Sequence, residues 1–408
     1  MTEWKTYKIA DLCKISSSKR IFAKEYKDSG IPFYRGKEII EKQKGNKIST
    51  ELYISQERYE EIKTKHGVPK KGDMLLTSVG TLGIPYIVQD EVFYFKDGNL
   101  TWFYDFDGLD SHYLYYWFLS PVGKMNIDSK AIGSTQKALT IETLSKFEIS
   151  LPSLEEQRRI AGILGAIDDK IENNRRINAN LELQAQALYK QWFVDFEFPN
   201  EEGKPYKSSG GKMVDSELGQ IPEGWRVGDI YKYVNVVYGA PYKSALFNER
   251  KDGNPLIRIR DLKTFSPQYY TQEILPNTEF ITAGDIVAGM DAEFVPCLWM
   301  GEKGVLNQRC CKFAGKQDSI SNYYVMFLVK PELEFVQSYK TGTTVSHLGK
   351  ADIDKFVVVQ PPMTVIEKFS KIADALLNNK IKLAKENITL ATLRDTLLPK
   401  LMNGEIKL

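Results

Sequence analysis

Small polar loops recur at corresponding places in the two halves of this 408-residue sequence. Serine, threonine, glutamine, lysine and arginine side chains can bond phosphate oxygens or base edges, and small residues allow a close backbone approach. Gly/Ser/Thr clusters also form plain turns. The recurrence of these loops with different side chains nevertheless fits the recognition of two different DNA half-sites. The predicted DNA contacts are Ser17, Lys19, Arg20, Ser78, Thr81, Ser134, Thr135, Gln136 and Lys137, then Tyr242, Lys243, Asp291, Glu293, Thr343, Thr344, Ser346 and His347.

The residues that usually build a catalytic centre are sparse. The histidines, His66, His112 and His347, stand at no metal-ligand spacing from one another or from a cysteine. The cysteines are Cys13, Cys297, Cys310 and Cys311, with no C-x-x-C among them, so neither a zinc site nor a disulfide framework is expected. The sequence has no phosphate loop and no dinucleotide-binding glycine motif. We expect no metal, no cofactor and no catalytic residue in this chain.

Two short stretches suggest enzymes only faintly. The sequence Gln360-Pro361-Pro362-Met363 approaches the aminomethyltransferase signature but lacks its amide or acid and its aromatic residue, so it is interpreted as a linker. Glu38 and Glu41, beside Lys37 and Lys42, faintly resemble a nuclease cluster. Such charges usually form a solvated helix face.

The basic residues are concentrated near the N-terminus. Net charge is only +2, yet residues 1–50 carry 12 Lys/Arg against 6 Asp/Glu, a local excess of +6. Lys24, Lys27, Arg35 and Lys37 belong to this excess. Phosphate binding depends on cations at the interface rather than on net charge, so a local basic face is compatible with DNA binding. A solvated charged surface is the alternative.

The elements that must position these loops occur twice, about 210 residues apart. The stretch from Gly133 to Pro152 corresponds to that from Gly342 to Pro361 at an offset of 209. In the same order, Ser111-His112-Tyr113 matches Ser321-Asn322-Tyr323, Gly72-Asp73-Met74 matches Gly284-Asp285-Ile286, Lys170-Ile171 matches Lys380-Ile381, and Trp4 matches Trp225. A period this long is too large for a solenoid, so two similar domains in tandem are predicted.

A heptad pattern predicts a long helix after each domain. From Ser153, with a capping box to Glu156, apolar or asparagine positions alternate four and three residues apart until Pro199 approaches. The first seam comprises Ile160, Leu164, Ile167, Ile171, Asn174, Asn178, Leu181, Ala185, Leu188 and Trp192, with Phe193 beside it. The second comprises Phe369, Leu376, Leu383, Leu390 and Leu397, with Ile372, Asn379 and Leu393 interleaved. The two helices are predicted to pair antiparallel; separate packing onto each domain is the alternative.

The predicted fold class is therefore α+β. It has two similar mixed α/β domains separated by two long antiparallel coiled-coil helices in a pseudo-twofold tandem repeat. The predicted segments are residues 1–152 (first domain), 153–199 (central helix), 200–223 (linker rich in Gly, Ser, Lys and Pro), 224–362 (second domain) and 363–408 (C-terminal helix). Within the first domain we expect strands near 84–88 and 92–95 and helices over 51–65 and 111–119.

Composition is that of an ordinary globular protein, with 42% hydrophobic and 26% charged residues. The longest apolar run is too short to span a bilayer, and the N-terminus does not resemble a secretory signal. A reducing cytoplasm is the expected location.

Several long stretches resemble type I restriction–modification specificity subunits. They include Leu154 to Ala161 (Leu-Glu-Glu-Gln-Arg-Arg-Ile-Ala), Ile167 to Ile171, and Leu188 to Phe196. Others are Gly219 to Trp225, Leu393 to Leu401 with Gly404-Glu405-Ile406, and Gly133 to Gln136. The resemblance covers essentially the whole chain. At the second helix start, Thr364 to Phe369 departs from the Glu-Glu-Gln-Arg pattern of the first.

The resemblance implies a non-catalytic DNA-binding subunit with two target-recognition domains. Each domain would read one half of a bipartite, asymmetric site on double-stranded DNA. Two modification subunits, which bind S-adenosylmethionine, would dock on the helical region and methylate an adenine in each half. Restriction subunits would add ATP- and Mg-dependent translocation and cleavage. The half-site centres would then lie about 10 base pairs apart, one helical turn.

Two other classes of protein are considered. A single-chain methyltransferase or nuclease would need an unusual active site, and S-adenosylmethionine binding by the isolated chain would indicate it. A stand-alone DNA-binding protein or a coiled-coil scaffold remains the other alternative. Mutation of Lys19, Arg20 or Lys243 would leave a scaffold unaffected but would weaken a DNA reader.

Overall fold

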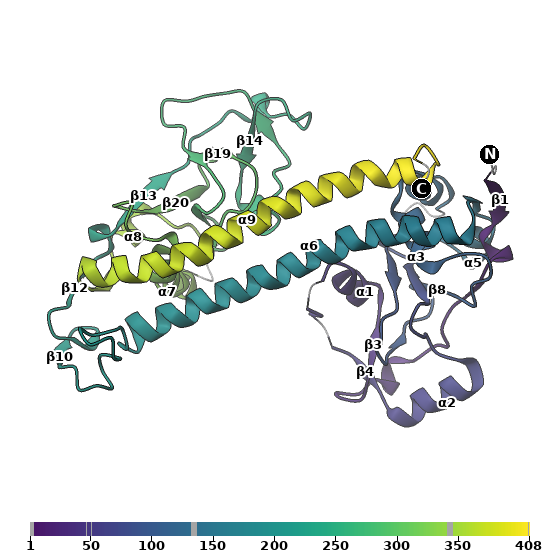
Figure 1. Cartoon of the computed structure of the whole chain (residues 1–408), viewed down its shortest axis with the longest axis horizontal. Coiled ribbons are helices and arrows are strands. Elements are labelled where there is room, and N and C mark those ends of the chain that lie inside the picture. The colour runs from purple at the N-terminus through teal and green to yellow at the C-terminus, as the bar shows by residue number, and fades with distance from the viewer. Residues whose placement is uncertain (1–3, 46, 50, 132–136, 341–345, 407) are drawn as a thin grey trace. The chain divides into compact units, whose positions relative to one another are not determined.

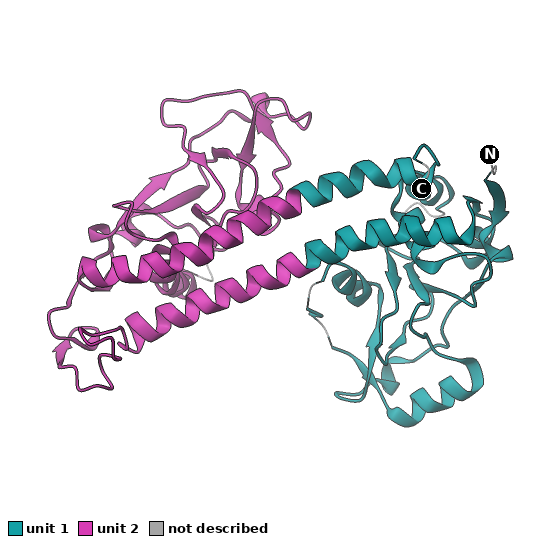
Figure 2. Cartoon of the chain, viewed as in Figure 1, with its two compact units in different colours: residues 1–172, 389–408 teal, residues 173–388 magenta. Residues whose placement is uncertain are grey.

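The computed structural model describes residues 4–45, 47–49, 51–131, 137–340, 346–406 and 408. The chain forms two compact units (Figure 2). Unit 1 comprises Met1–Glu172 and Thr389–Leu408, and unit 2 comprises Asn173–Ile388. Each unit therefore combines one globular domain with a segment of each long helix.

The sheets of unit 1 are short and mostly antiparallel. One has the order β2 (Lys14–Ser16), β8 (Leu100–Tyr104), β5 (Met74–Thr77) and β6 (Pro85–Ile87). A second has the order β4 (Tyr53–Ile54), β3 (Ile31–Tyr34) and β7 (Tyr94–Phe95), with β3 and β7 parallel. Strands β1 (Lys5–Lys8) and β9 (Glu148–Leu151) pair separately. The helices are α1 (Gly36–Gln43), α2 (Gln56–His66), α3 (Ser111–Leu119), α4 (Pro121–Lys130) and α5 (Ile141–Ser145), with 3-10 turns η1 (Ile9–Asp11) and η2 (Ala23–Glu25).

Unit 2, whose globular domain is drawn in green in Figure 1, repeats the strand order of the first sheet and adds a fourth strand at the edge of the second. Its first sheet runs β13 (Val234–Tyr238), β20 (Cys310–Gly315), β17 (Ile286–Gly289) and β18 (Pro296–Leu298). Its second runs β15 (Tyr270–Thr271), β14 (Asn254–Ile257), β19 (Gly304–Leu306) and β16 (Phe280–Ile281), with β14 and β19 parallel. Strands β12 (Arg226–Asp229) and β21 (Val357–Gln360) pair as β1 and β9 do. The remaining elements are η4 (Ile230–Lys232), η5 (Ser244–Leu246), η6 (Ile259–Lys263), α7 (Asn322–Lys340) and α8 (Lys350–Ile353).

The predicted tandem repeat of two mixed α/β domains is confirmed by this correspondence. The matched aspartates show why the sequence repeats at this point. Asp73 accepts a hydrogen bond from the Lys70 amide at 2.8 Å, and Asp285 accepts one from the Thr282 amide at 2.7 Å. Each carboxylate closes the turn before the central strand of its sheet, β5 or β17. The sequence match thus marks the same turn twice.

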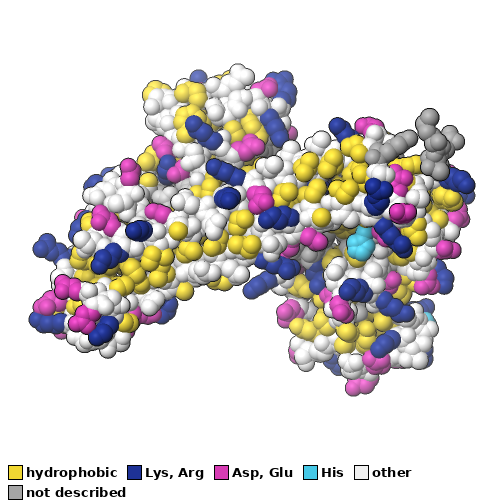
Figure 3. Space-filling model, in the orientation of Figure 1, with side chains coloured by type: hydrophobic (Ala, Val, Ile, Leu, Met, Phe, Trp, Pro, Cys, Tyr) yellow, Lys and Arg dark blue, Asp and Glu magenta, His cyan; other side chains and the backbone are white. Residues whose placement is uncertain are grey.

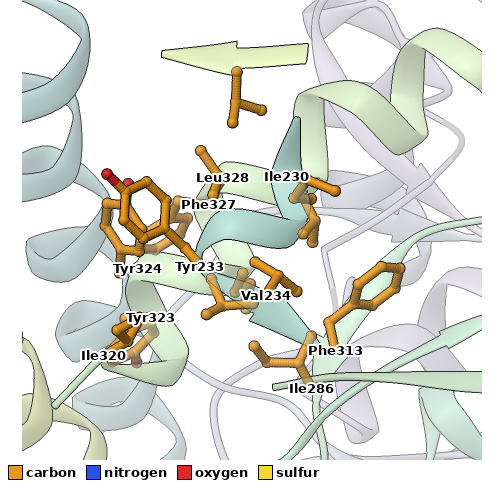
Figure 4. Close-up of a cluster of buried hydrophobic side chains, with 14 of the residues drawn as sticks. Ile230, Tyr233, Val234, Ile286, Phe313, Ile320, Tyr323, Tyr324, Phe327 and Leu328 are labelled. Atoms are coloured by element: carbon orange, nitrogen blue, oxygen red, sulfur yellow. The ribbon is translucent and has the colours of Figure 1, made fainter. Parts of the chain in front are cut away.

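Apolar helices hold the cores together. Helix α3 was predicted over residues 111–119 and has these bounds, with its Asp110 N-cap accepting from the amides of His112 and Tyr113. His112 itself is exposed. In unit 2 the corresponding part of α7 buries Tyr323, Tyr324 and Phe327 against Ile230, Val234 and Phe313 (Figure 4).

Two local expectations need correction. The helix predicted over 51–65 is instead strand β4 followed by α2, because the Ser55 hydroxyl caps the amide of Arg58 and starts the helix at Gln56. The predicted linker 200–223 contains a hairpin of β10 (Met213–Ser216) and β11 (Gly219–Pro222). Tyr206 stacks on Phe198 at 4.7 Å, and Phe198 stacks on Trp225 at 5.0 Å, so this segment is packed as well as exposed.

The long helices are α6 (Leu154–Tyr189), which continues as a π-helical turn over Lys190–Val194, and α9 (Met363–Met402). The Ser153 hydroxyl accepts from the Glu156 amide at 3.2 Å, as expected at the start of α6. Within unit 2, Asn174 donates to Glu386 at 3.0 Å and to Asn387 at 2.9 Å, and Lys380 pairs with Glu182. Within unit 1, Arg394 pairs with Asp168 at 2.8 Å. Residue numbers fall along α9 as they rise along α6, so the helices are antiparallel in each unit.

The two predicted seams differ in outcome. Every position of the α6 seam is buried or half-buried. In α9, Phe369 is buried and the four seam leucines are half-buried, but Ile372 and Leu393 are each 46% exposed, and Asn379 is exposed. The interleaved positions are therefore corrected. The buried stripe passes instead through Ala373, Leu377, Leu398 and Leu401, because a leucine every seventh residue fits either of two adjoining stripes.

No described helix is long and apolar enough to cross a membrane.

Candidate nucleic-acid interface

In unit 1, the structure brings the loop after β5 together with the described end of the loop before α5. Val79 forms a β-bridge with Ala138, and the amide of Gly80 donates to the carbonyl of Lys137 at 3.4 Å. The amide of Ser78 donates to the carbonyl of Asn99 at 2.8 Å. Ser134, Thr135 and Gln136 lie outside the described residues.

The basic loop of unit 1 adjoins the same turn. The Gly98 amide donates to the Ser17 hydroxyl at 3.3 Å, and Arg20 pairs with Asp97 at 2.7 Å while 70% of its side chain stays exposed. The amide of Lys19 donates to the Tyr94 hydroxyl at 2.6 Å. The turn at residues 97–99 therefore links the loops carrying Ser17 and Ser78. Lys19 and Arg20 also border a hollow of about 180 Å³ with Arg58, Glu61, Ile62, Lys65 and His66.

A wider cleft, about 720 Å³, lies between α1 and the loop after β5. Its lining residues are Arg35, Gly36, Lys37, Ile40, Glu41, Val79, Thr81 and Asn99. Of the predicted contacts, Thr81 lies in this cleft. Sequence reasoning missed Asn99; its position between a turn and a buried strand was the available signal.

The carboxylates beside this cleft have structural partners. Glu38 is buried and accepts from the Arg35 guanidinium at 2.6 and 3.1 Å and from the Arg35 amide at 2.8 Å. Burial opposes ionisation, but these bonds prevail and lower the pKa of Glu38. Glu41 binds Ser49, and Lys42 pairs with Glu91 at 2.7 Å. These groups therefore fix α1, and their geometry does not favour the nuclease interpretation.

In unit 2, the corresponding loops meet in the same way. Asp291 forms a β-bridge with His347, and the Ala292 amide donates to the Ser346 carbonyl at 3.0 Å. The amide of Met290 donates to the carbonyl of Arg309 at 2.8 Å, as that of Ser78 does to Asn99. Thr343 and Thr344 lie outside the described residues.

Charge distinguishes the loops of unit 2 from those of unit 1. The carboxylate of Asp291 lies 2.7 Å from Nδ1 of His347 and 3.3 Å from Nη1 of Arg309. Glu293 pairs with Lys263 of η6 at 2.7 Å. The positions that correspond to Asp291, His347 and Arg309 in unit 1 are occupied by the neutral Val79, Ala138 and Asn99.

Two predicted contacts are corrected by burial. Ser78 is 3% exposed and shares a hydrogen bond with Thr101 at 2.6 Å. Tyr242 is 5% exposed, and its hydroxyl bonds to Thr278 at 2.9 Å. Both side chains therefore stabilise their loops from the protein interior. The neighbouring Lys243 is exposed, and its amide donates to Glu273 at 2.9 Å.

Among the described residues, no group of three or more His, Cys, Asp or Glu side chains could hold a metal ion. Burial raises the pKa of the Cys311 and Cys13 thiols to about 12, which makes them poor nucleophiles.

Comparison with known proteins agrees with this architecture of two repeated domains. The family model described as "Type I restriction modification DNA specificity domain" matches residues 1–183 and 222–391. The chain belongs to this family of type I restriction–modification specificity subunits, and as a specificity subunit it is a non-catalytic component.

Individual relatives match over most of the chain. The type I restriction enzyme MjaIX specificity subunit of Methanocaldococcus jannaschii is 28% identical over 435 residues, covering 99% of this chain and 94% of that protein. The HindI specificity subunit of Haemophilus influenzae is 22% identical over 344 residues, covering 69% and 74%. The fold is similar to that of the S subunit from M. genitalium, with a TM-score of 0.60, 16% identity, and coverage of 98% and 96%.

Proposed function

We propose that this chain reads a bipartite, asymmetric site on double-stranded DNA, one half with each unit. The single observation that carries the proposal is the repetition of one loop framework with different side chains. The Ser78–Asn99 and Met290–Arg309 backbone bonds have the same geometry. The charged Asp291, His347 and Arg309 of unit 2 stand where unit 1 has the neutral Val79, Ala138 and Asn99. A repeated framework with unlike contact residues suits two half-sites of unlike sequence.

The chain would deliver this specificity to modification subunits that bind S-adenosylmethionine and methylate an adenine in each half-site. Restriction subunits would supply the ATP- and Mg-dependent steps. The geometry favours the long helices as docking surfaces, because apolar side chains gather over both of them on the face in view (Figure 3). Leu183 of α6 is 60% exposed and Leu393 of α9 is 46% exposed. The predicted seam residues Trp192 and Phe193 are buried and so hold the chain itself together.

Methylation mapping tests the function directly. The full chain is purified with its modification subunit, and methylated adenines are mapped in DNA exposed to the complex. A two-part motif with a degenerate gap is expected. Exchange of residues 1–152 for those of a relative should change one half of the motif only. Methylation at a continuous site, or a change in both halves, would contradict the proposal.

Docking is tested separately at the exposed apolar positions. Leu183→Asp or Leu393→Asp should weaken co-purification of the modification subunit without unfolding the chain, because each places a charge in a dry interface. Gln184→Asp, on an exposed neighbour of Leu183, is the matched control. Equal binding by all of these variants would exclude this part of the helices as the docking surface.

A further inference from the structure

We infer that Arg309 and Asn99 occupy one equivalent base-reading position in the two units, where Arg309 selects guanine and Asn99 selects adenine. This inference rests on the proposed function and names residues that would carry its specificity. Asn99 and Arg309 occupy the same position in a turn that both units contain.

The equivalence comes from strand register. Residue 100 pairs with Thr77 at the β5–β8 edge, and Cys310 pairs with Gly289 at the β17–β20 edge. Asn99 and Arg309 each stand immediately before that pair, and each accepts, through its carbonyl, a bond of 2.8 Å from the residue after the partner strand. The two side chains therefore leave matching points of the framework.

The turn carrying Arg309 is held firmly. The Arg309 amide donates to Oδ1 of Asn307 at 3.3 Å, and Asn307 is 9% exposed. The amides of Asn307 and Gln308 donate to the carbonyls of Ile257 and Ala240 at 3.1 and 3.0 Å. A rigid support of this kind is what a selective contact needs, because it removes the cost of ordering the turn on binding.

Asp291 suits the role of a support for the Arg309 guanidinium. Its Oδ2 lies 3.3 Å from Nη1 of Arg309, and His347 holds its Oδ1 at 2.7 Å. Asp291 is 22% exposed, whereas the Arg309 side chain is 58% exposed. A carboxylate at a DNA surface repels phosphates, but one that orients an arginine leaves the remaining N–H donors available. Two such donors match O6 and N7 of guanine in the major groove.

Asn99 offers the corresponding neutral contact in unit 1. Its side chain lines the cleft with Thr81 and Lys37. A carboxamide can donate to N7 and accept from N6 of adenine, a pattern that guanine does not present. The same turn would thus read different bases through one substituted side chain.

The test uses the full complex with the modification subunit and DNA that carries the mapped motif. Arg309→Ala should relax one guanine in the half-site of unit 2, reducing discrimination there by about 5- to 150-fold, and should leave the other half unchanged. Replacement of that guanine by 7-deazaguanine, which lacks N7, should slow methylation by the wild type but should have little effect on Arg309→Ala. Asn99→Ala with 7-deazaadenine is the parallel experiment in the other half.

Two further variants separate base reading from general binding. Asp291→Asn should lower discrimination at the same guanine while raising affinity for unrelated DNA, because a negative charge leaves the interface. Arg260→Ala, at another exposed arginine of unit 2, is the control and should leave discrimination at that guanine unchanged. Exposed ion pairs contribute little to folding, so these proteins should remain folded.

The outcomes distinguish this inference from the proposed function. An unchanged two-part motif with Arg309→Ala, or a unit 2 half-site that contains no guanine, would overturn the inference and leave the proposed function standing. A wild-type complex with no two-part motif would overturn both.

Discussion

Units 1 and 2 share a strand order but support it with different chemistry. Asp73 of unit 1 accepts a bond of 2.9 Å from the indole N–H of Trp102. At the matching strand position of unit 2, Lys312 pairs with Asp285 at 3.2 Å and with Glu279 at 2.9 Å. Likewise, α3 and α4 are separate in unit 1, where Ser120 caps a helix that starts at Pro121, whereas α7 continues through Pro331. The backbone plan tolerates either solution, which leaves the loops free to diverge.

The largest expected effect is on the aromatic cluster at the end of α6. Phe193 packs within 5.0 Å of Tyr324 and 5.1 Å of Phe369, measured between ring centroids. Phe193→Ala should cost about 3–5 kcal/mol of stability in unit 2. Met402 corresponds to Phe193 at the repeat offset of 209 residues, and Met402→Ala should cost about 2–5 kcal/mol of stability in unit 1. Hydrogen exchange during urea titration, resolved by peptide, measures each unit. If either variant reduced hydrogen-exchange protection equally in both units, the view that each unit has its own core would be contradicted.

The next test compares the charged and neutral partners of the matched aspartates. Lys312→Met should cost about 3–5 kcal/mol, because it leaves Asp285 and Glu279 without their cation. Trp102→Phe should cost about 1–3 kcal/mol, because it removes one neutral donor and leaves space where the indole stacks on Tyr104. Urea midpoints measure both, and a larger loss for Trp102→Phe would contradict the reasoning.

The pH dependence follows with its sign. Burial disfavours the charge of Lys312, but the bond to Glu279 and the proximity of Asp285 prevail and raise its pKa above 10.5. Its contribution is therefore complete below pH 10.5 and is lost as the pH rises through the raised pKa.

A smaller effect is expected at the start of α8. Asp352 pairs with Lys340 at 2.6 Å and accepts from the Gly349 amide at 2.8 Å. Burial opposes ionisation, but these bonds lower its pKa below 3.8. Asp352→Asn should cost about 1–2 kcal/mol above pH 3.8, and that stabilisation should vanish as the pH falls through the lowered pKa.

The control for Asp352 is the hydroxyl cap of α5 in unit 1. The Thr140 hydroxyl accepts from the Thr143 amide at 3.0 Å. Thr140→Ala should cost about 1 kcal/mol at any pH, because no charge is involved. Both variants are compared with the wild type by thermal unfolding between about pH 2 and pH 7, because carboxylates titrate in this range. Equal acid sensitivity of the two differences would contradict the assignment.

The smallest effect should be alike in the two units. The hydroxyls of Tyr113 and Tyr323 are buried and have no hydrogen-bond partner among the described residues. Tyr113→Phe and Tyr323→Phe should each be neutral or should stabilise by up to about 1 kcal/mol, because an unsatisfied polar group is removed. Thermal melts measure the change. Destabilisation of one unit alone would show that its hydroxyl has a partner, such as an ordered water.

Local sequence patterns predicted much of the fold, because they reflect interactions between residues close together in the chain. The α3 boundaries were predicted correctly because a capping residue and a run of apolar residues act within a few positions. The α6 seam was predicted in full because its spacing identifies a single stripe. The α9 seam was predicted only in part, because leucines at every seventh position fit two stripes and the choice depends on what packs against them.

The sequence by itself determined that the chain has two similar halves, each followed by a long helix, and that polar loops recur between them. Only the tertiary structure decided which loop residues are accessible. Ser78 and Tyr242 carry suitable groups but are buried beneath their loops. Asn99 in unit 1 and Arg309 in unit 2 each lie in the turn before a strand. Within each unit, a hydrogen bond between segments far apart in the chain brings this turn beside the loop, at residue 78 in unit 1 and at residue 290 in unit 2. No spacing within the sequence records such contacts.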